Sequence, residues 1–272
     1  VTEDIFRQML PDLKRNEPAV SSVHNFFPVP PILTKHQASG DAFSLSSPDK
    51  EEREQAVRYT KRTLEFAREA GAAAVVLHLG LTEMDDEYAR LKEECKEGVP
   101  AKHRNRIESL RAERRRISPK YLDAALFSLD KLWRPAETLS LALGIENRNT
   151  LREVPDAEEM DVIFTRFAGA PIGYWHDTGH GAVQELLYGI EHEGQLARFA
   201  DQLVGVHLHD AEAANDHMAP GKGKIDFAAI KKYIGDSTIR VIEVHSGVSE
   251  QDLRDGIEFL KERGLVFEGD LL

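Results

Sequence analysis

The sequence predicts an α/β fold, a (β/α)8 TIM barrel whose first one or two strands are lacking or truncated. Short apolar runs rich in β-branched residues alternate with longer amphipathic segments, which is the pattern of βα units in a parallel sheet. The 272 residues, 41% of them hydrophobic, suffice for one core of the size found in α/β barrels. We therefore expect one domain that spans residues 1–272.

Six segments are expected to form the strands of this sheet. They are residues 21–26, 73–80, 142–148, 171–177, 203–210 and 239–246. A closed barrel of this class has eight strands. Either strands precede this sequence, or the barrel is incomplete, or the tail at 264–272 contributes a strand.

Amphipathic segments between these runs are expected to be helices. In residues 46–71, Ser47 is the expected N-cap, Pro48 lies in the first turn and Gly71 ends the helix. Residues 121–144 form a second helix, with Pro135 as a position for a kink, and residues 249–264 form the last one.

Residues 81–118 form a highly charged insertion with helical tendencies. A solvated helical hairpin is the plain expectation, because runs of charge usually face water. Two functional roles are also open: a lid over the site, or an arm for dimerisation, which would make the protein a homo-oligomer.

Composition narrows the class of partner. The formal net charge of -12 repels a phosphate backbone, so nucleic acid is not an expected partner. No apolar run approaches the roughly 18 residues that cross a bilayer, and the first residues do not resemble a signal peptide, so we expect a cytoplasmic protein without a membrane partner. The single cysteine, Cys95, has no partner for an internal disulfide and no activating pattern around it.

The predicted strands carry ionisable side chains close to their carboxyl ends. These residues are His24, His78, Glu146, Asp177, His207, His209 and Glu243. Carboxyl ends of parallel barrel strands meet on one face, so side chains from distant sequence positions should surround one centre. Burying carboxylates without a partner is costly, and a cation would remove that cost.

The type of donor indicates the metal. Two glutamates, one aspartate and one histidine supply mostly hard oxygen ligands with one imidazole. This set suits one divalent ion, with Mn²⁺ favoured and Mg²⁺, Co²⁺ or Zn²⁺ also compatible.

The motifs around these residues resemble those of a known family. They are IENR at 145–148, WHDTGH at 175–180, GVHLHD at 205–210, APGKGKID at 219–226 and VIEVH at 241–245. Together they resemble the xylose isomerase-like TIM-barrel superfamily, which includes sugar-phosphate isomerases, ketose 3-epimerases and, more distantly, apurinic-site nucleases of the endonuclease IV type. The resemblance runs from about residue 21 to the last helix.

This resemblance implies roles for individual residues. Four of them would be the metal ligands: Glu146, Asp177, His207 and Glu243. Four histidines occupy places where the nucleases hold further zinc ions and where the isomerases contact substrate: His24, His78, His180 and His217. One departure is Asn215, which stands where the nuclease pattern has an anionic ligand.

Three more residues are candidates for contact with substrate. His209 shares a strand face with His207. Arg148 could hold a substrate hydroxyl or carboxylate, or orient an acid by pairing with it. Lys222 could meet a phosphate, although a plain loop before a helix also explains the Gly-Lys pairs around it.

These observations lead to a hypothesis of function: a metal-dependent sugar isomerase or epimerase acting on a small sugar or sugar phosphate. Glu146 and Glu243 would move a proton at the carbon next to a carbonyl, and the metal ion would stabilise the resulting enediolate. A lyase acting on an oxidised sugar or glycoside would begin with the same step. An endonuclease IV-like phosphodiesterase and a non-catalytic barrel that binds a partner subunit are the two remaining hypotheses.

Overall fold

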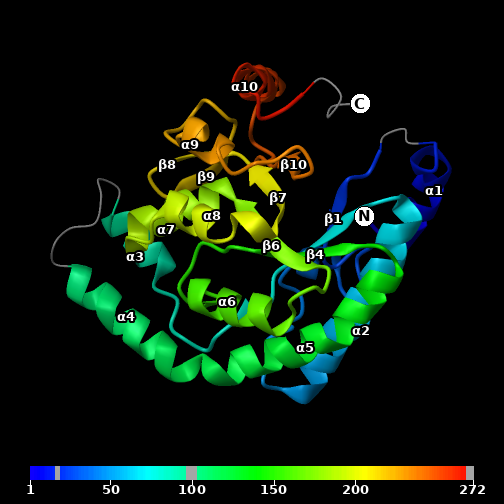
Figure 1. Cartoon of the computed structure of the whole chain (residues 1–272), viewed down its shortest axis with the longest axis horizontal. Coiled ribbons are helices and arrows are strands. Elements are labelled where there is room, and N and C mark those ends of the chain that lie inside the picture. The colour runs from blue at the N-terminus through cyan, green and yellow to red at the C-terminus, as the bar shows by residue number, and fades with distance from the viewer. Residues whose placement is uncertain (16–18, 96–102, 268–272) are drawn as a thin grey trace.

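The structure, a computed structural model, describes residues 1–15, 19–95 and 103–267. Its centre is one parallel sheet with the strand order β1-β2-β4-β6-β7-β10, curved toward a barrel and covered on its outside by helices (Figure 1). These strands are β1 Ser22–His24, β2 Ala74–Leu77, β4 Ala142–Glu146, β6 Ile172–Asp177, β7 Leu203–Leu208 and β10 Ile239–Ile242. The predicted fold class is confirmed.

Two short antiparallel pairs lie outside the main sheet. Their strands are β3 Gly80–Leu81 with β5 Glu153–Val154, and β8 Asp210–Glu212 with β9 Asn215–Met218. All six predicted parallel strands are present, but each is shorter than predicted. The run 239–246, for example, leaves the sheet after Ile242, because the polar residues that follow enter the loops at the carboxyl ends.

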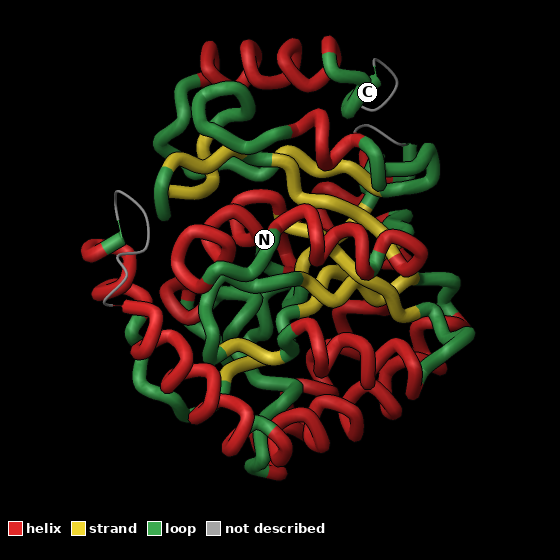
Figure 2. Tube along the Cα trace, turned by 60° about the vertical axis from the view of Figure 1, so that its left-hand side comes forward, coloured by secondary structure: helices red, strands yellow, loops and turns green. Residues whose placement is uncertain are grey.

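Helices follow the strands and enclose the sheet (Figure 2). They are α1 Glu3–Leu13, α2 Lys50–Ala70, α3 Tyr88–Glu94, α4 Arg104–Ile117, α5 Pro119–Thr138, α6 Ala157–Arg166, α7 Thr178–Tyr188, α8 His192–Arg198, α9 Phe227–Lys231 and α10 Glu250–Glu262, with short 3-10 turns at Lys35–Gln37 and Ala200–Gln202. Helices α2 and α5 lie side by side on one flank of the sheet (Figure 1). Helix α5 continues through Pro135 as one element.

One helix start differs from the prediction. Helix α2 is capped by Asp49, whose carboxylate accepts a hydrogen bond from the Glu52 N–H at 2.9 Å. The predicted cap, Ser47, instead accepts from the Asp49 N–H and lies outside the helix, as Pro48 does. The carboxylate two residues later has the reach and the charge to bind the exposed N–H groups of the first turn. Gly71 ends the helix as predicted, in the left-handed conformation with φ 86°.

Side-chain alternation explains which residues face the interior of the barrel. Along a strand, every second side chain lies on the same face. On β4, β6 and β7 the inward set contains Gly144, Trp175 and Gly205, and two residues further on come Glu146, Asp177 and His207. The outward set, such as Leu143, Ile145, Val206 and Leu208, joins the core beneath the helices.

Trp175 forms the apolar layer under the strand ends. A Cβ at Gly205 would lie 2.3 Å from Cζ3 of its ring, and one at Gly144 would lie 2.8 Å from Cε3. The indole therefore needs glycine on both neighbouring strands. Its ring centroid lies 5.1 Å from that of His207, so the layer supports this part of the site from below.

The described part of the charged insertion contains α3 and α4, while residues 96–102 lie outside the described residues. Leu91, Cys95 and Ile107 from this segment pack with Val183 and Leu187 of α7. One face of the insertion is therefore part of the packed fold, and many of its other charged side chains face water.

The last described residues, Leu265–Phe267, contain no strand, and residues 268–272 of the predicted tail strand lie outside the described ranges. Among the residues that the structure describes, we find no helix with the length and apolar character needed to cross a membrane.

Candidate metal centre

Four side chains meet at the carboxyl ends of the sheet. Glu146 ends β4, Asp177 ends β6, His207 lies near the end of β7, and Glu243 follows β10. One donor atom of each lies within 4.8 Å of the donor atoms of the others. The sequence predicted these residues as a ligand set, and the fold brings them together.

The shared contact of this group is Nδ1 of His207. It lies 2.9 Å from Oε2 of Glu243, 3.1 Å from Oε1 of Glu146 and 3.6 Å from Oδ2 of Asp177. One imidazole cannot neutralise three carboxylates, and buried charges of one sign need a counter-charge. A divalent cation fits this donor set of carboxylate oxygens and one ring nitrogen, with Mn²⁺, Mg²⁺, Co²⁺ and Zn²⁺ all compatible.

Electrostatics keep the acids ionised. Burial raises the pKa of Glu146, but the charges of His207 and His78 outweigh it and hold the pKa well below its ordinary value. Burial also raises the pKa of Asp177, and His180 and His209 outweigh it in the same way. For His207, burial lowers the pKa, but the surrounding carboxylates, Glu146 first, leave it well above the usual value. The carboxylates are therefore available as ligands at neutral pH.

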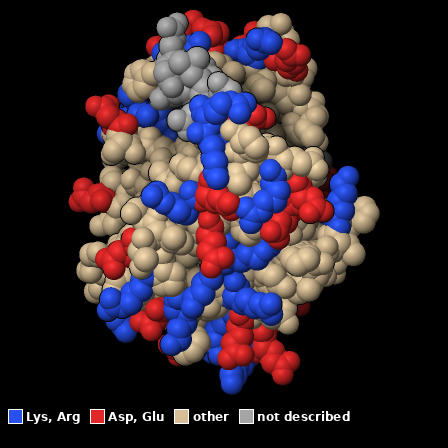
Figure 3. Space-filling view, turned by 90° about the vertical axis from the view of Figure 1, so that its right-hand side faces the viewer, with Lys and Arg blue, Asp and Glu red and all other residues tan. Residues whose placement is uncertain are grey.

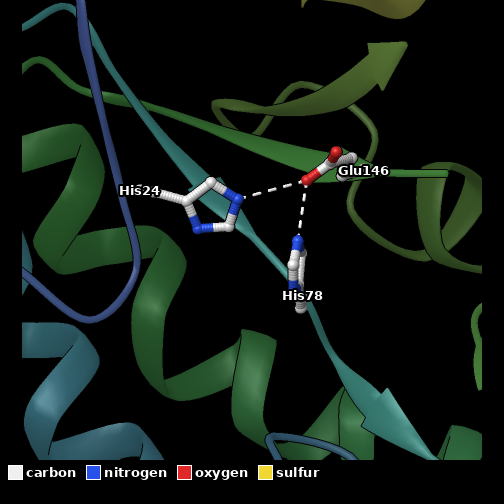
Figure 4. Close-up of side chains that lie close together, drawn as sticks. All are labelled: His24, His78 and Glu146. Carbon is white, nitrogen blue, oxygen red and sulfur yellow. Dashed lines mark hydrogen bonds and ion pairs between the residues drawn. The ribbon is translucent and has the colours of Figure 1, made fainter. Parts of the chain in front are cut away.

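Two further histidines point at Glu146 from neighbouring strands (Figure 4). Nε2 of His78 lies 2.8 Å from Oε2 of Glu146, and Nε2 of His24 lies 3.2 Å from the same oxygen. Nδ1 of His24 contacts the carbonyl of Asn25 at 3.0 Å. The three side chains form a second group of donor atoms beside the first.

Asp177 is held from several directions. Its Oδ1 caps α7 by accepting from the His180 N–H at 2.7 Å, and its Oδ2 lies 2.9 Å from Nε2 of His209. Nδ1 of His209 accepts from the His217 N–H at 2.8 Å, so Nε2 carries the proton and donates to Asp177. His209 is fully buried, so the contact it makes here is with the metal centre; its predicted contact with substrate stays a prediction.

A stack of imidazoles extends the centre on this side. The His217 ring lies 4.0 Å from that of His209 and 4.7 Å from that of His245, centroid to centroid. His217 and His180 form a further group of donor atoms with Asp177. Asn215 is exposed, but the next residue, Asp216, places Oδ1 3.4 Å from Nδ1 of His217. Asp216, on β9, thus gives His217 a neighbouring carboxylate, and the two form another group of donor atoms with His245.

Arg148 and Lys222, the two predicted cationic contacts, have different surroundings. Arg148 donates to Glu153 at 2.9 Å, and its Nη1 lies 2.8 Å from Nε2 of His78. Lys222 instead pairs with Asp252 of α10 at 2.6 Å. Its loop is fastened by Asp210, which accepts from the backbone N–H groups of residues 221 and 225.

Two residues of the site were not singled out in the sequence. Asn147 brackets Asp177 by accepting from its N–H at 2.6 Å and donating to its carbonyl at 3.1 Å. Asp41 contacts Nδ1 of His78 at 2.8 Å. Asn147 directly follows the candidate ligand Glu146, and this position in the sequence could have marked it as a site residue. Asp41 lies in a loop without periodicity, so the sequence offers no such signal for it.

A cavity of about 690 Å³ adjoins the centre. Its lining includes Asn147, Arg148, Tyr174 and, from α4, Arg111 and Arg115. None of the four predicted ligands is among the residues that line it.

Comparison with known families gives one match over most of the chain. The family described as xylose isomerase-like TIM barrel matches residues 22–263. The range includes every predicted site residue. A curated relative, an uncharacterised protein of Sinorhizobium fredii, is 32% identical over 82 residues, which cover 29% of this chain and 24% of that protein.

Similar solved structures share the fold over almost the whole chain. A D-tagatose 3-epimerase-like protein matches with a TM-score of 0.65 at 17% identity, covering 100% of this chain and 86% of that one. The 3-keto-D-glucoside 4-epimerase of E. coli matches at 0.66 and 15%, covering 95% and 85%. A D-psicose 3-epimerase in the presence of D-fructose matches at 0.65 and 13%, covering 96% and 85%.

Proposed function

The chain belongs to the xylose isomerase-like TIM-barrel family, and we propose that it is a divalent-metal-dependent isomerase or epimerase of a small sugar or sugar phosphate. The observation that carries the proposal is the meeting of Glu146, Asp177, His207 and Glu243, with donor atoms within 4.8 Å of one another. The similar structures named for sugar epimerases support a sugar as the substrate.

A divalent ion bound by these four residues would supply Lewis acidity, polarising the carbonyl and a neighbouring hydroxyl of an open-chain ketose. Two of the residues, Glu146 and Glu243, then have a second task. Both carboxylates contact Nδ1 of His207, at 3.1 and 2.9 Å, so both border the same small space. We assign to one the removal of the proton next to the carbonyl and to the other its return.

Exposure suggests which acid meets the substrate first. The Glu243 side chain is 40% exposed, whereas that of Glu146 is 2% exposed. Burial raises the pKa of Glu243, but the hydrogen bond and charge of His207 outweigh it and lower the pKa, so the side chain is an ionised base at neutral pH. Return of the proton to the opposite face of the same carbon gives an epimer, and return to the adjacent carbon gives an isomer.

Among the residues predicted to contact substrate, those whose side chains are partly exposed are the better candidates. His24 has 31% of its side chain exposed and His217 has 18%. His78 and His180 line the same centre at greater depth, and Arg148, with 16% of its side chain exposed, contacts His78. We propose these five as the residues that hold substrate hydroxyl groups.

The proposal is tested by proton exchange. A panel of ketoses and keto-glycosides is incubated with the protein and Mn²⁺ in deuterated water, and incorporation at carbon is followed by NMR. Without metal, Glu243→Gln should keep the thermal unfolding of the wild type, and with Mn²⁺ present it should show no exchange. Glu212→Gln, at an exposed acid paired with Lys224, should leave exchange unchanged. Exchange at the normal rate in Glu243→Gln would exclude Glu243 as the base. An unsaturated product in place of an epimer or isomer would identify a lyase.

One observation favours a second candidate, a phosphodiesterase of the endonuclease IV type. Two further groups of donor atoms adjoin the four-residue group: His24, His78 and Glu146, and Asp177, His180 and His217. Against it stand the net charge of -12 and the mixture of acidic and basic side chains on the face seen in Figure 3. Metal analysis of the purified protein separates the two, because the nuclease would need about three tightly held zinc ions.

A further inference from the structure

We propose that Asn147 is a positioning residue of the metal centre, which it serves by holding the backbone of Asp177 in place through its side-chain amide. The inference rests on the proposed function in one respect, namely that Asp177 is a metal ligand. Asn147 directly follows β4, Asp177 ends β6, and the two strands are neighbours in the sheet.

The backbone ladder between these strands ends just before Asp177. Its last paired residues are Glu146 and Trp175, and the Asn147 N–H donates to the Trp175 carbonyl at 3.2 Å. Bonds in a parallel ladder are evenly spaced, so the next two would join the neighbouring strand to the N–H and the carbonyl of Asp177. Strand β4 ends at Glu146, and these two buried backbone groups therefore need other partners.

The side-chain amide of Asn147 supplies both partners. Its Oδ1 accepts from the Asp177 N–H at 2.6 Å, and its Nδ2 donates to the Asp177 carbonyl at 3.1 Å. An amide offers an acceptor and a donor, as a peptide unit does, so the side chain continues the ladder by one step. Asn147 is 3% exposed and Asp177 is 0% exposed, so water has little access to replace either bond.

The backbone carbonyl of Asn147 makes a different contact because the side chain has taken its place in the ladder. It lies 3.0 Å from Nδ1 of His180, in the first turn of α7. Oδ1 of Asp177 caps the same turn by accepting from the His180 N–H at 2.7 Å. Asn147 therefore contacts both sides of the junction between β6 and α7.

The position of the Asp177 carboxylate depends on this junction. An aspartate side chain is short, so its oxygens follow the position of its backbone. Oδ2 of Asp177 lies 2.9 Å from Nε2 of His209 and 3.6 Å from Nδ1 of His207, which places it in the group of predicted donor atoms. A shift of the junction would move this oxygen relative to the other ligands, and partners that orient ligands in this way tune metal binding.

The test compares Asn147→Ala with Asn149→Ala. Asn149 is a fitting control because it lies in the same loop and donates to Asp216 at 3.4 Å, not to one of the four predicted ligands. In metal-free wild type, the Asp177 amide proton should show the downfield shift and slow exchange of a short, buried hydrogen bond. In Asn147→Ala this proton should shift upfield and exchange faster, whereas in Asn149→Ala it should keep its wild-type shift.

A second measurement separates positioning from support of the fold alone. Partners of metal ligands typically change metal affinity by about 10–100-fold, so folded Asn147→Ala should bind Mn²⁺ more weakly by such a factor, and Asn149→Ala should not. Asn147→Ser is the milder variant, because its hydroxyl can accept from one N–H but cannot span both backbone groups of Asp177. It should show a smaller loss of affinity in the same direction.

Two results would overturn the inference. One is an unchanged Asp177 amide shift in Asn147→Ala, and the other is Mn²⁺ affinity of both variants at position 147 equal to that of Asn149→Ala. A lower unfolding temperature with unchanged Mn²⁺ affinity would show a purely structural role. Wild-type protein that binds Mn²⁺ but exchanges no proton of any ketose would refute the proposed function and leave this inference standing, whereas wild-type protein that binds no Mn²⁺ would refute both.

Discussion

The contacts of Arg114 allow one prediction to be worked out in detail. This residue lies in α4, within the charged insertion, and its side chain is 4% exposed. It donates to both carboxylate oxygens of Glu159 at 2.9 and 2.7 Å, and it reaches Asp156 at 2.8 Å. It also donates to the carbonyls of Leu151 and Glu153 at 2.7 and 2.8 Å. One guanidinium group therefore fastens the insertion to the start of α6.

The magnitude follows from what Arg114→Met would leave behind. Methionine retains much of the apolar packing but removes every donor, so a buried glutamate and two carbonyls lose their partner. Breaking a buried ion pair in this way costs about 3–5 kcal/mol. For a chain of this size, each kcal/mol lowers Tm by about 2–4 °C, so the expected decrease is about 6–20 °C.

The assay is urea and thermal unfolding of Arg114→Met beside Arg115→Met. Arg115 is the next residue on the same helix and is exposed, so its replacement should change the free energy of unfolding by less than about 0.5 kcal/mol. Equal stability of the two variants would refute the view that the insertion is fastened to the barrel through Arg114.

Three further predictions concern the site and the layer beneath it. Mn²⁺ at 100 times its Kd should stabilise the wild type by about 2.7 kcal/mol relative to protein treated with a chelator, and Glu243→Gln should lose most of this gain in thermal unfolding. The pKa of Asp41 is lowered from 3.8 to about 2, so its contribution to stability is present above pH 3.8 and is lost as the pH falls toward 2. In urea unfolding of metal-free protein, Asp41→Ala should therefore lose less stability over this pH range than the wild type. An equal loss in the two proteins would contradict the contact between Asp41 and His78. Gly205→Ala should destabilise the fold by about 1–3 kcal/mol, because its Cβ would lie 2.3 Å from the indole ring of Trp175. Gly235→Ala is the control and should not destabilise the fold, because the nearest atom to its Cβ would be 3.9 Å away. Equal unfolding midpoints of the two variants would contradict the packing argument.

The meeting of the four candidate ligands could be predicted from the sequence because it depends on local patterns. Glu146, Asp177 and His207 lie at the ends of apolar runs, and the convergence of parallel strands does not require knowledge of any long-range contact. Strand alternation also turns His176 away from the face that carries Asp177, and its ring contacts Tyr174 at 2.8 Å and His192 at 2.9 Å on the outer face. Patterns with a fixed period were therefore sufficient for this part of the site.

The partners of these ligands could not be predicted in the same way. Asp41 reaches His78 from 37 positions away, and neither its loop nor the β8–β9 hairpin that brings Asp216 to His217 has a period that fixes side-chain direction. The choice between Ser47 and Asp49 as the helix cap depended on which side chain reaches the N–H groups of the first helical turn, and both residues lie in the same short polar segment. The orientation of Lys222 toward Asp252 likewise depends on where α10 packs, which is a tertiary contact.

Anomalous diffraction from a crystal grown with Mn²⁺ tests the central claim most directly. The account predicts a manganese peak bounded by Glu146, Asp177, His207 and Glu243, and loss of that peak in Glu243→Gln. A wild-type map with these four side chains clustered at the strand ends and no ion between them at saturating Mn²⁺ would contradict it.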